Sequence, residues 1–370
     1  MTDKPLPFRV LCLDGGGMRG LYSATLLDTL IKRVRGTGDS VDAGKAFDLI
    51  VGTSTGGILA LGLAYGLPLQ DIIDLYAKKG TGIFPNPMPK NIGGWLSWLP
   101  KRQGAANTGQ AALRRALEEQ FQETTIKQLY DERGIAVCVP AVRMATRKAW
   151  VFKTPHIPAR ENHQAKNRDD NYKLTDVCLA TSAAPILLPL AAVDNPDDKT
   201  RYDVFADGGL WANNPTLIGL IEALEITESE RDIQIISVST ASPPTGKVIE
   251  KSDVNFGLTD WKAGVGALET SLDAQASGTQ FMAKFLCPHL KANVEIIRLA
   301  YDAPSNEQAM CVALDRADKK AITALTDMAK SDAENNILGV DSRHSEEEKK
   351  LLREIINSMP VIENALQEAA

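Results

Sequence analysis

The stretch that decides the fold is Phe47-Asp48-Leu49-Ile50-Val51-Gly52-Thr53-Ser54-Thr55-Gly56-Gly57-Ile58. Its apolar first half predicts a buried strand, and its Gly-x-Ser-x-Gly pattern predicts a sharp turn from that strand into a helix. Such a turn holds its central residue in strained backbone geometry and projects the side chain into a cleft. Gly52 and Gly56 lack a Cβ, so strand and helix can approach closely on either side. Ser54 is therefore the predicted nucleophile.

A second glycine-rich turn lies upstream, at Asp14-Gly15-Gly16-Gly17-Met18-Arg19-Gly20, between an apolar run and a helical pattern. Backbone N–H groups in such a loop suit a phosphate or a developing oxyanion. The loop also matches Gly-x-Gly-x-x-Gly, the pattern of dinucleotide-binding folds, but those folds should next show a strand that ends in an acidic residue. Here the next strand leads into Ser54, so dinucleotide binding is the weaker alternative.

The residues Tyr202-Asp203-Val204-Phe205-Ala206-Asp207-Gly208-Gly209 predict a strand with an acid at its C-terminal end. Ligands bind at that edge of parallel α/β sheets, so Asp207 is expected to face Ser54. Held by the N–H groups of Gly208 and Gly209, Asp207 could accept the serine proton directly. Two alternatives stay open: the acid belongs to a simple turn, or a histidine that follows it in the chain, His289 or His344, is the base.

Composition limits the classes of protein. The chain has 370 residues, of which 44% are hydrophobic and 24% charged, which favours one α/β domain. A net charge of −6 argues against a protein that coats a nucleic acid polymer. The start of the chain has no leader pattern, no stretch has the apolar length of a membrane span, and five cysteines are scattered. We therefore expect a cytoplasmic location.

Residues 80–107 change in character, with three prolines between positions 85 and 89 and a cluster that includes Trp95 and Trp98. The prolines exclude regular structure at the start, and long loops in compact domains are usually functional. Tryptophans beside cations suit the boundary between water and acyl chains, so a lid or membrane-contact surface is predicted. The alternative is a loop that folds its aromatic side chains onto the core.

The glycine loop, the Gly52–Gly56 elbow and Asp207-Gly208-Gly209, in this order, resemble the patatin-like phospholipase family. The resemblance covers about residues 7–240 and includes Ala180-Thr181-Ser182-Ala183-Ala184-Pro185. It implies an α/β fold, a three-layer sandwich with a mostly parallel central sheet between helices. Residues 1–240 would form the catalytic core, with a lid-like insertion at about 80–107, and residues 241–370 a helical and regulatory extension.

The resemblance also implies the chemistry. It implies a Ser54–Asp207 dyad, an oxyanion hole formed by the amides of Gly15, Gly16 and Gly17 with Arg19 nearby, and hydrolysis of lipid acyl esters without a metal or cofactor. One departure is Ser239-Thr240-Ala241-Ser242, where many members carry a Gly-Thr-Gly-like turn.

Regulation is expected as well, because an enzyme that cuts phospholipids endangers the membrane of its own cell. The bacterial branch that the chain resembles includes anti-phage effectors activated by cyclic dinucleotides, which degrade the inner membrane. The alternatives are an unregulated housekeeping lipase, an exported lipase, and a binding module without activity. Substrate preference, activator-binding residues and the presence of a homodimer are left open by the sequence.

Overall fold

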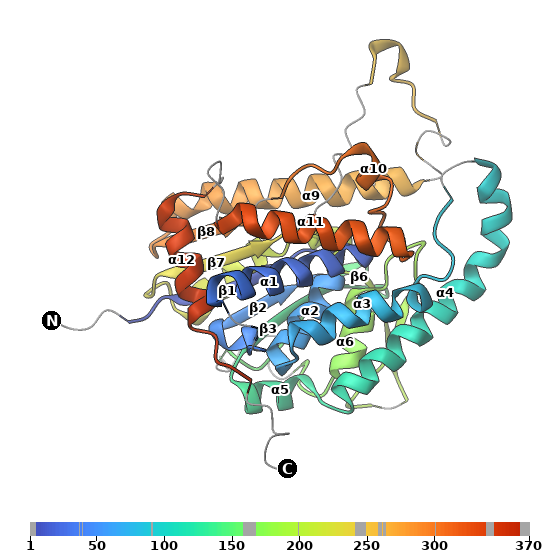
Figure 1. Cartoon of the computed structure of the whole chain (residues 1–370). Helices are drawn as coiled ribbons and strands as arrows, with labels where there is room; N and C mark the ends of the chain where they lie inside the picture. Colours follow the sequence, from blue (N-terminus) through green and yellow to red (C-terminus); the bar gives the residue numbers. More distant parts are fainter. Residues whose placement is uncertain are drawn as a thin grey trace, which may run out of the picture.

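The computed structural model describes residues 5–36, 38, 40–89, 92–157, 168–198, 200–240, 249–257, 261, 264–299, 301–337 and 344–362. Within these ranges the chain forms one mixed, mostly parallel sheet between helices, as expected from the sequence. Figure 1 shows this layered arrangement, with helices in front of the strands and others behind.

The sheet has eight strands. They are β1 (Phe8–Leu13), β2 (Leu49–Gly52), β3 (Ala136–Arg143), β4 (Lys148–Lys153), β5 (Ala191–Asp194), β6 (Tyr202–Asp207), β7 (Ile233–Val238) and β8 (Val294–Arg298). The order is β5-β6-β3-β2-β1-β7-β8, and β4 pairs with β3. From β3 to β8 the neighbouring strands are parallel, whereas β4 and β6 are antiparallel to β3 and β5 is antiparallel to β6.

The helices are α1 (Gly20–Arg35), α2 (Thr55–Tyr65), α3 (Leu69–Ile83), α4 (Ile92–Phe121), α5 (Ile126–Arg133), α6 (Leu174–Thr181), α7 (Gly209–Ala212), α8 (Thr216–Ile226), α9 (Val265–Leu286), α10 (Asn306–Ala309), α11 (Lys319–Ile337) and α12 (Glu346–Asn357). Short 3-10 segments occur at Gly17–Arg19, Ala43–Ala46, Lys251–Asp253 and Cys287–His289. No helix in the described ranges is both long and apolar enough to span a bilayer.

The alternation of side chains along β1 builds two cores. Leu11 and Leu13 join the larger cluster with α1, α2 and α11, while Val10 and Cys12 join a smaller cluster with α8 on the opposite face. Successive strand residues point to opposite faces, and both faces here are covered, so β1 is apolar throughout. Figure 1 shows α11 beside α1, which joins the C-terminal part of the chain to its beginning.

The prediction that residues 80–107 form an irregular loop was wrong. Only residues 84–89 lack helix or strand among those described there, and α4 begins at Ile92 and contains Pro100. The side chain of Trp98 is 6% exposed and its indole N–H donates to the carbonyl oxygen of Asn86 at 2.9 Å, so it packs on the core. The side chain of Trp95 lies outside the described residues.

The region after residue 240 is mainly helical and also extends the sheet. Strand β8 pairs in parallel with β7 over five residues, from Val294 opposite Ile233 to Arg298 opposite Ser237. The end of β8 therefore lies near the carboxyl ends of β1 and β7. Arg298, the last residue of β8, therefore lies next to the glycine loop.

Candidate active site

Ser54 lies at the turn between β2 and α2, as predicted. Its backbone has φ 55° and ψ −122°, a left-handed φ that costs a residue with a Cβ about 1–3 kcal/mol. The turn has no room for side chains: a Cβ at Gly52 would overlap the carbonyl oxygen of Gly56, and one at Gly56 would overlap the backbone of Leu13. The backbone N–H of Ser54 donates to Thr181 Oγ1 at 2.9 Å, and that hydroxyl donates to the carbonyl oxygen of Pro140 at 2.6 Å.

Strand β3 brings Asp207 to Ser54. Val51 pairs with Cys138 of β3, and Asp207 pairs with Ala141, three residues further along the same strand. Ser54 also lies three residues beyond Val51, so the two side chains reach the same level of the sheet. Asp207 was expected at the end of a parallel strand, but β6 is antiparallel to β3 and enters beyond the end of β2.

Ser54 and Asp207 are in direct contact. Ser54 Oγ donates to Asp207 Oδ2 at 2.7 Å, and the N–H of Gly209 donates to Asp207 Oδ1 at 2.6 Å. The N–H of Gly208 was expected to hold Asp207, but it donates instead to the carbonyl oxygen of Thr181. Burial raises the pKa of Asp207 to about 6, against the opposing effect of the two hydrogen bonds. A carboxylate of this kind can accept a proton from Ser54 near neutral pH.

The glycine loop lies beside the dyad. Gly15, Gly16 and Gly17 line one cavity together with Ser54 and Asp207. The N–H of Gly15 donates to the carbonyl oxygen of Asn213 at 3.0 Å, so this amide is already used. Within the described part of the chain, the N–H groups of Gly16 and Gly17 have no hydrogen-bond acceptor. These two amides are therefore available to bind an anion in the cavity.

Arg19 follows the glycine loop and is 6% exposed. Its Nε donates to the carbonyl oxygen of Gly16 at 3.4 Å, and the side chain lines the same cavity. Burial lowers the pKa of Arg19, while the carboxylates of Asp273 and Glu269 in α9 oppose that shift. Arg19 thus connects the loop to the C-terminal part of the chain.

The cavity at Ser54 is mostly apolar, apart from a polar floor formed by the dyad and the glycine loop. Its empty space is about 780 Å³ when the open solvent at its mouth is included. Its walls include aliphatic and aromatic side chains from six regions of the chain, namely Ile58, Ile83, Phe84, Leu113, Leu187, Leu188, Leu268, Leu272 and Leu314. Such a wall matches an acyl chain.

The histidines that were alternatives for the base lie elsewhere. The side chains that line the cavity, among the described residues, include neither His289 nor His344. His344 Nε2 lies 2.7 Å from Asn336 Oδ1, and His289 is in the 3-10 segment that follows α9. Asp207 is the carboxylate in contact with Ser54.

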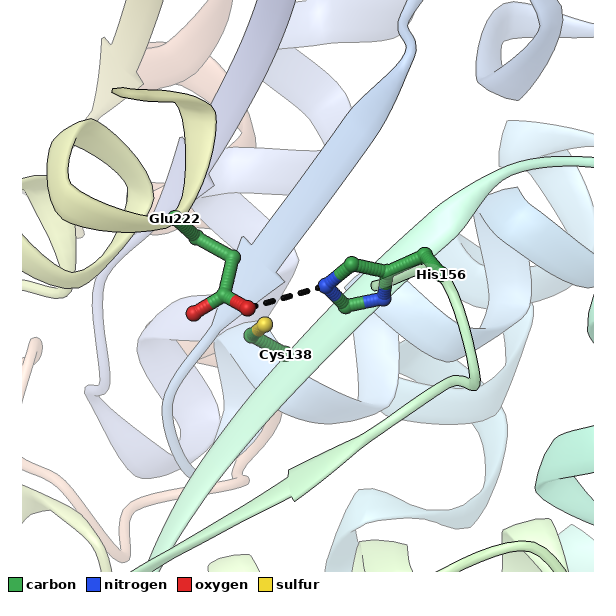
Figure 2. Close-up of side chains that lie close together, drawn as sticks. All are labelled: Cys138, His156 and Glu222. Atoms are coloured by element: carbon green, nitrogen blue, oxygen red, sulfur yellow. Dashed lines mark hydrogen bonds and ion pairs between the residues drawn. The ribbon is translucent and has the colours of Figure 1, made fainter. Parts of the chain in front are cut away.

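Cys138, His156 and Glu222 form a buried cluster on the other side of the sheet, and their ligand atoms lie within 4.8 Å of one another (Figure 2). Their geometry could hold a metal ion, but the polar atoms already satisfy one another. Glu222 accepts from Lys153 Nζ at 2.5 Å and lies 3.0 Å from His156 Nε2, and His156 Nδ1 bonds Thr154 Oγ1 at 2.7 Å. Lys153 supplies the charge that Glu222 needs, so the cluster fits a structural ion pair.

Three residues of the site had no assigned role before the structure. Thr181 holds the elbow, and the carbonyl oxygen of Asn213 accepts from the glycine loop. Thr240 Oγ1 donates to the carbonyl oxygen of Gly15 at 3.1 Å, at the position where the family-like turn is altered. Their roles depend on contacts across the fold, which no local pattern encodes.

Comparisons with known proteins agree with this geometry. The Patatin-like phospholipase family matches residues 11–220. A "cGAMP-activated phospholipase" from Pseudomonas aeruginosa is 36% identical over 291 residues, which cover 76% of this chain and 78% of that protein. One from Escherichia coli is 38% identical over 248 residues, or 65% of this chain and 63% of that protein.

Among solved structures, human GIVD cytosolic phospholipase A2 aligns with a TM-score of 0.42 at 11% identity, over 96% of this chain and 64% of that one. The family match covers the elbow, the glycine loop and the dyad strand. The chain belongs to the patatin-like phospholipase family, and it is a serine carboxylic ester hydrolase.

Proposed function

We propose that this protein is a phospholipase of the A type that cleaves acyl esters of membrane phospholipids, with Ser54 as nucleophile and Asp207 as general base. The observation that carries the proposal is the 2.7 Å hydrogen bond from Ser54 Oγ to Asp207 Oδ2 at the floor of an apolar cavity. The cavity would receive the acyl chain, and the polar floor would receive the ester.

In the first half of the reaction, Ser54 Oγ attacks the ester carbonyl carbon while its proton passes to Asp207 Oδ2. The amides of Gly16 and Gly17 stabilise the oxyanion of the tetrahedral intermediate. The intermediate collapses when the carbon–oxygen bond to the lysophospholipid breaks, and the leaving oxygen takes the proton from Asp207. Ser54 is now esterified by the fatty acyl group.

In the second half, water attacks the acyl-enzyme and gives one proton to Asp207. The bond to Ser54 Oγ then breaks, the fatty acid leaves, and Asp207 returns the proton to Ser54. Both halves use one carboxylate as base and then as acid. This role suits a pKa of about 6, which is close to the working pH.

We also propose that a cyclic dinucleotide activates the enzyme in anti-phage defence, and that it acts in the cytoplasm at the inner face of the membrane. The support is the name of the bacterial relatives, which are cGAMP-activated phospholipases. A burst of hydrolysis after the addition of cGAMP to enzyme and vesicles is the expected result. Full activity without any nucleotide would contradict the proposed regulation.

The test of the proposed function is release of free fatty acid from phospholipid vesicles, with and without cGAMP. Ser54→Ala should release none, while the control Ser331→Ala, which changes an exposed serine of α11, should behave as wild type. Circular dichroism must show that both variants are folded. Release by folded Ser54→Ala at the wild-type rate would exclude the proposed mechanism.

A further inference from the structure

Asp14 is a buried carboxylate at the start of the glycine loop, with 4% of its surface exposed. Both of its oxygens are bound by one side chain: Arg298 Nη1 donates to Asp14 Oδ1 at 2.9 Å, and Arg298 Nη2 donates to Oδ2. Arg298 Nη1 also donates to Ser237 Oγ at 2.7 Å, so the pair is anchored on β7. This is a bidentate pair, the geometry in which arginine binds a carboxylate most specifically.

Arg298 remains charged although its side chain is partly buried. Although burial lowers its pKa, Asp14 raises it above the ordinary value for arginine. Burial also raises the pKa of Asp14, an effect that Arg298 opposes. Without Arg298, the buried carboxylate of Asp14 would lose the side chain that binds both of its oxygens and keep only the influence of Arg19, which favours uptake of a proton or a shift of Asp14 toward water.

The C-terminal part of the chain holds the loop at a second point. The N–H of Met18 donates to the carbonyl oxygen of Leu314 at 2.8 Å, and a Cβ at Gly17 would overlap that same oxygen. Arg298 and Leu314 both lie beyond residues 11–220, the range that matches the family. Residues outside the matched range therefore fix both ends of the proposed oxyanion loop.

We propose that Arg298 is a positioning residue for hydrolysis: it holds Asp14, and through Asp14 it holds the amides of Gly16 and Gly17 in the place where they meet the oxyanion. This inference rests on the proposed function. The mechanical reason is that Asp14 adjoins the loop, so a shift of its backbone moves the next amides. The electrostatic reason is that an uncompensated carboxylate next to the loop would repel the oxyanion.

The test compares Arg298→Met, Arg298→Lys, Asp14→Asn and the double variant Asp14→Asn/Arg298→Met. The matched control is Arg133→Met, which removes a different partly buried arginine, one that donates to Asp42 Oδ2 at 2.5 Å and to the carbonyl oxygen of Ala64 at 2.9 Å. For each variant, kcat and KM on a soluble short-chain ester and the rate of Ser54 labelling by a fluorophosphonate are measured with and without cGAMP, and Tm is measured as well.

We expect Arg298→Met to lower kcat and the labelling rate by about 10- to 100-fold with little change in KM, because it disturbs the oxyanion donors and leaves the acyl cavity intact. Arg133→Met should lower Tm and leave kcat unchanged. The double variant should recover part of the kcat lost in Arg298→Met, since it removes the carboxylate that was left unpaired. Arg298→Lys keeps the positive charge but cannot form the bidentate pair, so its kcat should lie between those of wild type and Arg298→Met.

If Arg298→Met does not fold, Arg298→Lys and the double variant decide the question. Wild-type kcat in folded Arg298→Lys and in the double variant, with only Tm lowered as in Arg133→Met, would overturn the inference. Failure of the proposed function has a different signature: wild type itself would not hydrolyse the ester, or Ser54→Ala would hydrolyse it equally well.

Discussion

Ser54 and Asp207 combine two unfavourable features that a stable fold alone does not require. Ser54 has a left-handed φ of 55°, and the carboxylate of Asp207 is 5% exposed with a raised pKa. Backbone strain and a desolvated carboxylate both lower the free energy of unfolding, and contacts elsewhere in the chain offset this loss. Their occurrence in two residues that touch each other is the pattern expected of a catalytic pair.

Replacing Asp207 with Asn should abolish turnover and leave the fold intact. The amide oxygen can still accept from Gly209, and the amide nitrogen can donate to Ser54, but the group cannot take a proton at neutral pH. The shift of the Asp207 pKa from 3.8 to about 6 corresponds to a penalty of about 3 kcal/mol at pH 7, which the amide removes. Thermal denaturation should therefore show a Tm equal to or above that of wild type. Near-normal turnover would mean that another group is the base.

The pH dependence follows from the same carboxylate. The base must be ionised, so kcat/KM should rise tenfold per pH unit below about pH 6 and become constant above it. Stability should change in the opposite sense. The folded state holds its proton to a higher pH than the unfolded state, so Asp207 lowers the free energy of unfolding as pH rises from about 4 to 6. A kcat/KM that stays flat from pH 5 to 8 on a soluble ester would contradict this assignment.

At the scale of elements, the glycine loop is confined by neighbours from two directions. A Cβ at Gly16 would lie 2.5 Å from Thr240 Oγ1, whereas Gly17 has φ +56° and faces the backbone of Leu314. Gly16→Ala should lower kcat by up to about 100-fold, since the loop amides would move away from the oxyanion. Thr240→Ala added to it should restore part of the activity by making room. Gly17→Ala should lower kcat whichever residue occupies position 240, because the added Cβ would clash with the backbone of Leu314. Wild-type kcat in Gly16→Ala would show that the loop tolerates the added methyl group.

Helix α4 contains Trp98, from the segment for which the sequence predicted a lid. Trp98 is buried and bonds the 84–89 connection through Asn86, and Phe84 of that connection lines the cavity. Trp98→Ala should therefore lower stability by about 3 kcal/mol and reduce hydrolysis of vesicles and of a soluble ester to the same extent. Urea denaturation and the two assays measure this. A loss confined to vesicles would restore the interpretation of Trp98 as a membrane contact.

The local patterns of the chain predicted much of the sheet and of the site. Strands β1, β2 and β6, both glycine turns and the Ser54–Asp207 pair follow from apolar runs that end in glycine or acid. The first part of helix α4 was missed because Pro100 and several glycines argue against a helix, while packing of α4 against α3 and α6 favours it. The pair of Asp14 and Arg298 was not predictable, because 284 residues separate the partners and neither has a distinctive local pattern.

At the scale of the whole molecule, the site combines residues from both ends of the chain with Asp207 from its middle. The first third of the sequence supplies the nucleophile and the glycine loop, while Leu268, Leu272 and Leu314 complete the cavity from the C-terminal side. Arg19 faces carboxylates of α9, and Arg298 of β8 binds Asp14. A movement of the C-terminal part would therefore change both the acyl cavity and the oxyanion loop. This is a physical route by which an activator could raise kcat without touching Ser54.

The most direct test of the central claim is to trap the acyl-enzyme and locate it. Protein is mixed with a short-chain ester, quenched in acid within the first turnover, digested and examined by mass spectrometry. The account predicts a peptide that carries the acyl group on Ser54, formed far more slowly in Asp207→Asn and absent in Ser54→Ala. An acyl group on another residue, or full ester hydrolysis by folded Ser54→Ala, would contradict it.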